Sequence, residues 1–216
     1  MRRGPTRGGR LLAVEGIDGT GKSTLVRALA RALRRRGERV AVRREPVDPM
    51  LGRLAQEASR RDPWTGAVYF TLDRHMALPA LLRDLSTHDL VLTDRSFYST
   101  LAYQGSALAA ADRTRLARLQ RRVTVVPDRV ILLDLGPAEA LRRVGDRSPQ
   151  RGPLEQRRIL DRVSRAYRRM ARAPGWIVVD ARRPTAAIVG EVVSRLVGAA
   201  RAGDRRSRRT AARRRR

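Results

Sequence analysis

The residues best suited to chemistry lie in one short stretch of the chain, residues 16–23. Gly16, Gly21, Lys22 and Ser23 fit the spacing G-x-x-x-x-G-K-[ST] without adjustment. Glycines allow backbone N–H groups to close around phosphate oxygens, and the N-terminus of a following helix adds positive potential. The Lys22 ammonium would then reach the β- and γ-phosphates, and the Ser23 hydroxyl would ligate Mg²⁺. The pattern therefore predicts a loop that binds a nucleoside triphosphate.

The flanking residues are typical of a strand before this loop and a helix after it. Residues 11–14 are apolar, and Leu25, Leu29 and Leu33 repeat every four residues. This context distinguishes a phosphate-binding loop from a glycine-rich turn that matches by chance. Lys22 is also the only lysine among 48 lysine and arginine residues. A planar guanidinium cannot replace a compact ammonium inside such a loop. The single lysine of the chain therefore stands at the position where arginine could not serve.

A carboxylate follows a second apolar strand. Residues 90–93 read Leu-Val-Leu-Thr and are followed by Asp94 and Arg95. In a parallel sheet this places Asp94 at the carboxyl edge near the loop, where an acidic side chain would hold Mg²⁺ directly or through water. The alternative role for Asp94 is to cap a helix. We favour the metal role because a strand precedes Asp94 and Arg95 adjoins it.

The elements that must position these residues alternate along the chain. Strands are expected at about 10–15, 39–43, 90–93, 129–134 and 176–179. Helices are expected at about 22–36, 50–60, 64–85, 99–106, 112–123, 137–145, 154–170 and 184–198. Pro79 would break or kink the third helix, and Asp112 would cap the fifth. The alternation predicts an α/β fold with a doubly wound five-stranded parallel sheet, and the loop at residues 16–23 makes it a P-loop fold.

Length and composition suit one globular domain. The 216 residues are 42% apolar and include no cysteine, which excludes disulfides and thiolate metal sites. We expect a basic flexible N-terminus at 1–9, a P-loop domain at 10–200, and an arginine-rich disordered tail at 201–216. No apolar run reaches the roughly 18 residues that span a bilayer, so we predict a cytoplasmic protein without a membrane partner.

The charge of the chain favours anionic partners. The formal net charge is +27, and arginines are concentrated in residues 201–216. Non-specific contact between this tail and nucleic acid is therefore expected at low salt. The remaining arginines are spread along predicted helix faces, as solvent-exposed charges usually are.

Other motifs narrow the reaction. The chain lacks the Asn-Lys-x-Asp signature of guanine-nucleotide binding, which disfavours a GTPase. It also lacks the long insertion or second domain that would suggest a motor. The sequence favours a compact kinase that transfers a γ-phosphoryl group to a small acceptor.

Several of these motifs resemble the thymidylate kinase family. They are residues 16–23, Arg44-Glu45-Pro46, residues 70–74, Pro127-Asp128, and the run from Asp94-Arg95 to Ala102-Tyr103-Gln104-Gly105. The last run is the most specific, and the resemblance covers about residues 10–200. It implies ATP-dependent phosphorylation of dTMP to dTDP with Mg²⁺, in a homodimer. The residues implied to bind ATP are Gly16, Ile17, Asp18, Gly19, Thr20, Gly21, Lys22, Ser23 and Thr24.

The resemblance also implies roles in acceptor binding. Phe70 would stack on the thymine ring and Arg74 would hydrogen-bond its carbonyl edge. Core packing is the alternative role for Phe70 and Tyr103. Arg44 and Arg95 would hold the acceptor phosphate, and Tyr103 would crowd the sugar 2′ position. Asp18 would lie near the sugar 3′-hydroxyl, and Thr100 and Gln104 would contact the base.

The source of a catalytic arginine follows from Gly19. Some members of the family carry an arginine at this position of the loop, and members with glycine resemble the subgroup that supplies the arginine from the lid. The resemblance therefore points to Arg147 or Arg151, with Arg143 as a further candidate. The resemblance implies a fold of the nucleotide kinase type with a short lid at about 145–154, which contains Arg147 and Arg151. These two arginines, with Lys22 and Arg95, form the expected catalytic set.

The chain also departs from the family pattern. Val47-Asp48-Pro49 stands where a Gly-Gly-Thr stretch is usual, and Ser96 stands where an aromatic residue is usual. Both departures lie near the expected acceptor phosphate. The alternative that the protein is another deoxynucleoside or nucleoside-monophosphate kinase on the same scaffold therefore stays open. A nucleoside kinase would need a carboxylate to deprotonate the hydroxyl of its acceptor, and Glu45 is the candidate. The second alternative is a P-loop protein that binds nucleic acid through its tail and uses ATP as a switch.

Overall fold

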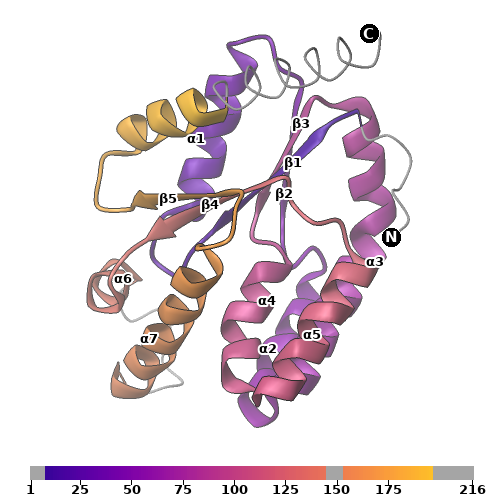
Figure 1. Ribbon diagram of the computed structural model, residues 1–216, viewed down its shortest axis with the longest axis vertical. Coiled ribbons are helices and arrows are strands. Elements are labelled where there is room, and N and C mark those ends of the chain that lie inside the picture. The colour runs from indigo at the N-terminus through magenta and orange to yellow at the C-terminus, as the bar shows by residue number, and fades with distance from the viewer. Residues whose placement is uncertain (1–7, 145–152, 197–216) are drawn as a thin grey trace, which may run out of the picture.

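The computed structural model describes residues 8–144 and 153–196. Its centre is a five-stranded sheet in the order β2-β3-β1-β4-β5 (Figure 1). Every neighbouring pair of strands is parallel. The strands are β1 Arg10–Glu15, β2 Val40–Arg44, β3 Leu90–Asp94, β4 Arg129–Asp134 and β5 Trp176–Asp180.

Helices cover both faces of this sheet. Figure 1 shows α1 and the last helix, over 185–196, on one side of β4 and β5, and α7 on the other. This arrangement confirms the predicted doubly wound α/β fold. The helices are α1 Lys22–Arg34, α2 Pro49–Arg61, α3 Pro63–Thr87, α4 Phe97–Tyr103, α5 Ala110–Val123, α6 Pro137–Val144 and α7 Pro153–Met170, with a 3-10 turn at Gly105–Ala107.

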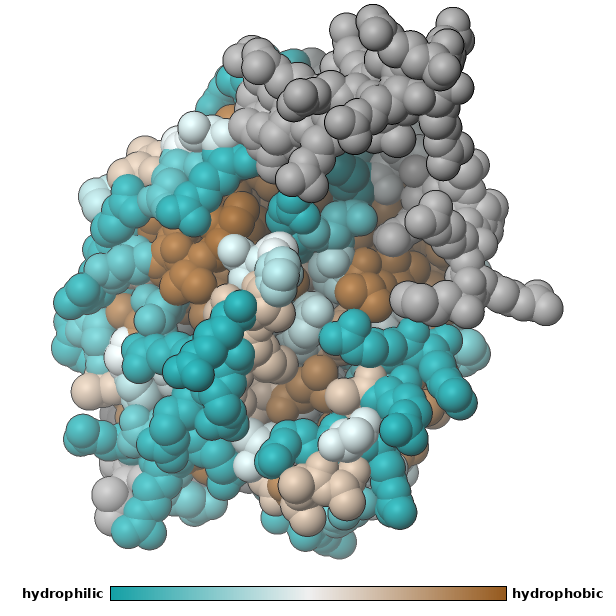
Figure 2. All heavy atoms as spheres, viewed as in Figure 1, coloured by the Kyte–Doolittle hydropathy of each residue, from teal (hydrophilic) through white to brown (hydrophobic). Residues whose placement is uncertain are grey.

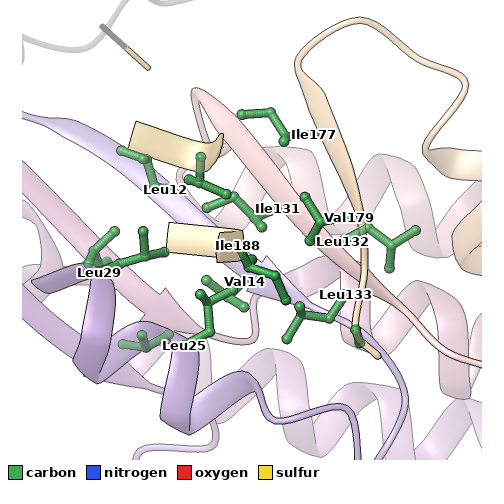
Figure 3. Close-up of a cluster of buried hydrophobic side chains, with 14 of the residues drawn as sticks. Leu12, Val14, Leu25, Leu29, Ile131, Leu132, Leu133, Ile177, Val179 and Ile188 are labelled. Atoms are coloured by element: carbon green, nitrogen blue, oxygen red, sulfur yellow. The ribbon is translucent and has the colours of Figure 1, made fainter. Parts of the chain in front are cut away.

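The core lies between the central strands and the helices on each face. All residues of β3 are buried, as are the last five of β1. Parallel strands covered on both faces must be apolar throughout, which explains the continuous apolar runs in the sequence. Figure 3 shows Leu25 and Leu29 of α1 and Ile188 of the last helix converging on Val14 and Ile131 of the sheet.

Two expectations about helix ends and breaks are wrong. Pro79 does not break α3, which continues through it for 25 residues, while a kink there stays a prediction. Buried residues lie on both sides of the proline, from Gly66 to Leu85, so tertiary packing outweighs the loss of one backbone hydrogen bond. α5 begins at Ala110 with Ala109 as its N-cap, so Asp112 lies in the first turn. There its carboxylate still interacts favourably with the helix dipole.

The helix that carries the most specific motif also begins earlier than expected. α4 spans Phe97–Tyr103 because Ser96 caps it, accepting a hydrogen bond from the Tyr98 N–H. The predicted helix at 99–106 therefore divides into α4 and the 3-10 turn. This earlier start places Ser99 and Thr100 in the middle of the helix.

The surface is strongly charged. Figure 2 shows hydrophilic side chains over much of one face, with hydrophobic residues between them. Within the described ranges, no helix is long and apolar enough to cross a membrane. Most of the predicted basic N-terminus, nearly all of the predicted lid and the arginine-rich tail lie outside the described residues, so the domain limits stay predictions.

Candidate functional site

The loop after β1 has the backbone that a phosphate cradle needs. Gly19 has φ 84° and Gly21 has φ 87°, a left-handed region that favours glycine. Gly21 is the N-cap of α1, and Lys22 is its first residue. The first N–H groups of α1 have no intrahelical partner, so the loop presents them together with the positive end of the helix dipole.

Lys22 points into this loop. Its side chain is only 8% exposed, and its Nζ donates a hydrogen bond to the Ile17 carbonyl oxygen at 2.8 Å. Asp18 Oδ1 is 4.0 Å from the same nitrogen. Burial, and next the nearby Arg95, lower the pKa of Lys22 to about 8. The ammonium is thus held where negative phosphate oxygens would stabilise its charge.

Ser23 and Asp94 meet at the carboxyl edge of the sheet. Asp94 is the last residue of β3 and lies beside Val14 of β1. The Ser23 hydroxyl donates to Asp94 Oδ2 at 2.5 Å. Because Ser96 caps α4, Asp94 does not have the alternative role of a helix cap. Mg²⁺ prefers oxygen ligands, and this pair offers a hydroxyl and a carboxylate side by side, so the two residues fit this ion.

Arg95 joins the loop to α4. Its Nη2 donates to Asp18 Oδ1 at 2.5 Å, and the Tyr103 hydroxyl donates to Asp18 Oδ2 at 3.1 Å. The guanidinium carbon lies 5.3 Å from the centre of the Tyr103 ring. Burial, and next the charge of Asp18, raise the pKa of Tyr103, so its hydroxyl stays a hydrogen-bond donor at neutral pH. Asp18, Arg95 and Tyr103 therefore form one cluster beside Lys22.

Arg74 is the centre of a second cluster. Its Nε and Nη2 donate to Glu45 Oε2 at 2.9 and 2.6 Å, and its Nη1 donates to Gln120 Oε1 at 2.8 Å. Nη2 also lies 3.3 Å from the hydroxyl of Thr100. Phe70 is partly exposed on α3, one turn before Arg74. The structure thus brings Arg74 and Thr100 together and places Phe70 on the same helix.

The other residues predicted to bind the acceptor, Gln104 and Arg44, lie outside these two clusters. Gln104 is nearly buried, and its side-chain amide donates to the Ser59 hydroxyl of α2 at 3.0 Å. Arg44 ends β2 opposite Asp94 and is exposed. With Glu45 and Arg74 it lines a cavity of about 20 Å³. The candidate lid arginines, Arg147 and Arg151, lie outside the described residues.

A second cavity, of about 330 Å³, borders the loop. Gly19, Thr20 and Thr24 line it together with residues 181–185. Arg143 also lines it, donating from Nη1 to the Ala181 carbonyl oxygen at 3.0 Å. This cavity has room for the base of a bound nucleotide. Sequence reasoning did not identify residues 181–185, because no motif marks them.

Three buried polar residues also escaped the sequence reasoning. Gln120 supports Arg74, and Asp73 accepts hydrogen bonds from the Val47 and Asp48 N–H groups of the loop after β2. Glu15 is fully buried at the end of β1, and this burial raises its pKa. A charged residue ending an apolar strand was the available signal for Glu15, whereas no pattern marked Gln120.

The fold and this site define a P-loop nucleotide kinase. A loop with the backbone of a phosphate cradle carries Lys22 and Ser23, and Arg95, whose guanidinium suits a second, anionic molecule, lies beside it.

Comparison with known proteins identifies the family. A family model described as thymidylate kinase matches residues 14–192. The chain is 36% identical over 188 residues to the "Probable thymidylate kinase" of Pyrobaculum calidifontis, covering 85% of this chain and 93% of the relative. It is 36% identical over 204 residues to the thymidylate kinase of Xanthomonas euvesicatoria, covering 88% of each chain. A "Probable thymidylate kinase" of Archaeoglobus fulgidus is 33% identical over 184 residues, covering 84% of this chain and 92% of the relative. The chain belongs to the thymidylate kinase family, as its motifs predicted.

Proposed function

We propose that this protein transfers the γ-phosphoryl group of ATP to dTMP, yielding ADP and dTDP. An oxygen of the dTMP phosphate forms the new bond to the γ-phosphorus, and the bond from this phosphorus to the β–γ bridging oxygen breaks. The observation that carries the proposal is the cluster of Asp18, Arg95 and Tyr103 beside Lys22. It joins the loop for the donor phosphates to side chains suited to a second nucleotide.

On the donor side, the loop residues 16–24 bind the phosphates of ATP, and the cavity of about 330 Å³ takes its base. Lys22 neutralises charge on the β- and γ-phosphates. Ser23 and Asp94 are the residues that would hold Mg²⁺. When bound, this ion neutralises phosphate oxygens that gain charge as the group is transferred.

On the acceptor side, Arg95 and Arg44 bind the phosphate of dTMP, which brings it towards the γ-phosphate despite their like charges. Tyr103 faces the sugar with Asp18. Phe70 stacks on the base, and Gln104 and Thr100 border it.

Arg74 gives base discrimination. Its guanidinium donates to a carbonyl oxygen of thymine, whereas the amino group of cytosine at that position would face it as a second donor. A donor left without its acceptor in a buried site is strongly disfavoured. We therefore expect dTMP to be preferred over dCMP.

The catalytic arginine comes from the lid in this proposal. A Cβ added at Gly19 would lie 2.3 Å from the Ala140 carbonyl oxygen of α6, so the loop has no room for its own arginine there. Arg143 is held by Glu139 and the Ala181 carbonyl oxygen, which leaves Arg147 or Arg151 for this role. We expect the alanine variant of the catalytic one to lose about 100-fold in kcat, as loss of a transition-state donor does, and the other to keep most activity.

The ion pair of Glu45 argues against a nucleoside kinase. Phosphorylation of a sugar hydroxyl needs a carboxylate base, but Glu45 Oε2 accepts hydrogen bonds from both Nε and Nη2 of Arg74. The phosphate of a nucleoside monophosphate is already anionic and needs no strong base. This difference favours a monophosphate acceptor.

An acceptor panel tests the proposal. ADP formation is measured with dTMP, dUMP, dCMP, AMP and thymidine, and with no acceptor. We expect the highest kcat/KM with dTMP and loss of turnover in Lys22→Ala. Preference for thymidine would indicate a nucleoside kinase, and ADP formation independent of every acceptor would overturn the proposal.

Deletion of residues 201–216 tests the nucleic-acid alternative. A kinase keeps its kcat/KM for dTMP without the tail, while non-specific binding to DNA weakens and its salt dependence becomes less steep. If the deletion instead removed dTMP kinase activity, the tail would have a role that the proposal does not include.

We further propose a homodimer that works in the cytoplasm, where ATP is available. Val68, Leu72 and Met76 support the dimer, because they are 45%, 43% and 64% exposed and lie four residues apart on α3. An exposed apolar row of this kind suits packing against a second copy of the chain.

A further inference from the structure

The fully buried carboxylate of Glu15 has no part in the mechanism above. It ends β1, immediately before the phosphate-binding loop. Its Oε1 accepts hydrogen bonds from the N–H and hydroxyl of Ser96, at 2.8 and 2.7 Å. Its Oε2 accepts from the hydroxyls of Ser99 and Tyr167, at 2.6 and 2.8 Å. Both oxygens are therefore fully used by donors from the segment after β3 and from α7.

The first of these contacts supports an unusual backbone at Arg95. This residue has φ 76°, the one positive value among the described residues other than glycine. Such a conformation persists only where the surrounding structure holds it. Here the Arg95 N–H donates to the Val14 carbonyl oxygen at 3.0 Å, the Thr93 hydroxyl donates to the Arg95 carbonyl oxygen at 2.8 Å, and Glu15 holds the next residue.

The second contact reaches the guanidinium of Arg95. The Ser99 hydroxyl donates a hydrogen bond to Glu15, so its oxygen is turned to accept the hydrogen bond from Arg95 Nη1 at 3.0 Å. Arg95 Nη2 donates to Asp18 Oδ1. The guanidinium is thus fixed at one nitrogen through Glu15 and at the other through the phosphate-binding loop.

We propose that Glu15 is a positioning residue for phosphoryl transfer, which holds the backbone and the guanidinium of Arg95 in the orientation that binds the acceptor phosphate. This inference rests on the proposed function. An amide could not take its place unchanged, because glutamine offers one acceptor oxygen and would turn N–H groups towards the hydroxyls of Ser99 and Tyr167. The charge of Glu15 would also be lost beside Arg95.

A double-mutant cycle on kcat tests this role. Glu15→Gln is expected to lower kcat about 10- to 100-fold, as small misplacements of a binding group do, with a KM for ATP within about twofold of the parent. If Glu15 acts through Arg95, Glu15→Gln in an Arg95→Lys background should lower kcat less than about threefold further. Asp84→Asn is the matched control. It weakens the Asp84–Arg43 pair, 2.6 Å long, and should lower the melting temperature with kcat unchanged.

Ser99→Ala provides a second route if Glu15→Gln does not fold. It removes the link from Glu15 to the guanidinium and a 3.0 Å contact with the Tyr167 hydroxyl, but it keeps the carboxylate of Glu15 and its contacts with Ser96. It should therefore lower kcat in the same direction and show the same coupling to Arg95→Lys. The parent enzyme is measured first with the acceptor panel, and the cycle uses the acceptor that it prefers. A parent without acceptor-dependent turnover would overturn the proposed function and this inference together. A parent with turnover would overturn this inference alone if Glu15→Gln kept kcat within twofold, or if its loss were equal in both backgrounds.

Discussion

At the scale of single residues, the environment of Lys22 should make the proposed binding of ATP depend on pH. Burial and Arg95 lower the pKa of its ammonium to about 8, but only the charged form attracts phosphate. Bound ATP should favour the protonated form and raise this pKa. At pH 8.5 the protein should therefore take up protons as ATP binds, and its affinity for ATP should fall as the pH rises above 8.

Calorimetry in two buffers of different ionisation enthalpy measures this proton uptake. Lys22→Ala is the control and should show no uptake at the same pH. Equal heats of ATP binding in both buffers at pH 8.5 would contradict the prediction.

Gln120 is the second residue with a measurable effect. Gln120→Met removes the acceptor for Arg74 Nη1 and the donor to the Thr71 hydroxyl, while keeping the volume of the side chain. The loss of a hydrogen bond to a charged group, about 1.5 kcal/mol, should raise the KM for dTMP about tenfold. Steady-state kinetics with each substrate varied in turn would test this, since the KM for ATP should not change. Thr114→Val, at an exposed position of α5, is the control.

At the scale of elements, the close approach of α2 and α3 depends on Gly66. A Cβ at this position would lie 1.9 Å from the Ser59 hydroxyl oxygen and 2.8 Å from the Ser59 Cα. Gly66→Ala should therefore lower the free energy of unfolding by about 1–3 kcal/mol, because the helices must separate. Ser59 also accepts the Gln104 hydrogen bond, so the acceptor site should be disturbed as well.

Gly190 provides the matched control for this substitution. It also lies in a helix, over 185–196, but a Cβ there would meet no atom within 4 Å. Gly190→Ala should raise the free energy of unfolding by about 0.5–1 kcal/mol, because alanine loses less backbone entropy in a helix. Urea denaturation measures both variants, and changes of the same sign would show that packing at Gly66 is not the cause.

At the scale of the whole molecule, the apolar row on α3 predicts how two copies assemble. Leu72→Glu should place a charge in the middle of the proposed interface and convert the proposed dimer to a monomer that retains its helix content. Val178→Glu introduces the same charge on the edge strand β5, where Val178 is 43% exposed, and should leave the dimer intact. Sedimentation velocity separates these outcomes, and a dimeric Leu72→Glu protein would place the interface elsewhere.

Local sequence was sufficient to predict the strands and the phosphate-binding loop. β1 and β4 have the predicted bounds. A strand that is buried on both faces is apolar at nearly every position, so its length can be read from the apolar run in the sequence. Lys22 and Ser23 belong to a motif whose residues are adjacent in sequence. Their proximity in space can therefore be predicted without knowing the fold. The helix ends were less predictable. The start of α4 depends on the cap that Ser96 forms, whereas α5 begins at Ala110 without a side-chain cap. The passage of α3 through Pro79 depends on packing.

By itself, the sequence determined the fold class, the phosphate-binding loop and the family. Tertiary structure alone decided how the site is held. Glu15 and Tyr167 are 152 positions apart, and Arg74 and Gln120 are 46 apart. The cavity for the base of ATP likewise joins the loop at residue 19 to residues 181–185. Contacts over such separations leave no periodic or local pattern, because they arise only when the parallel strands bring their carboxyl ends to one edge of the sheet.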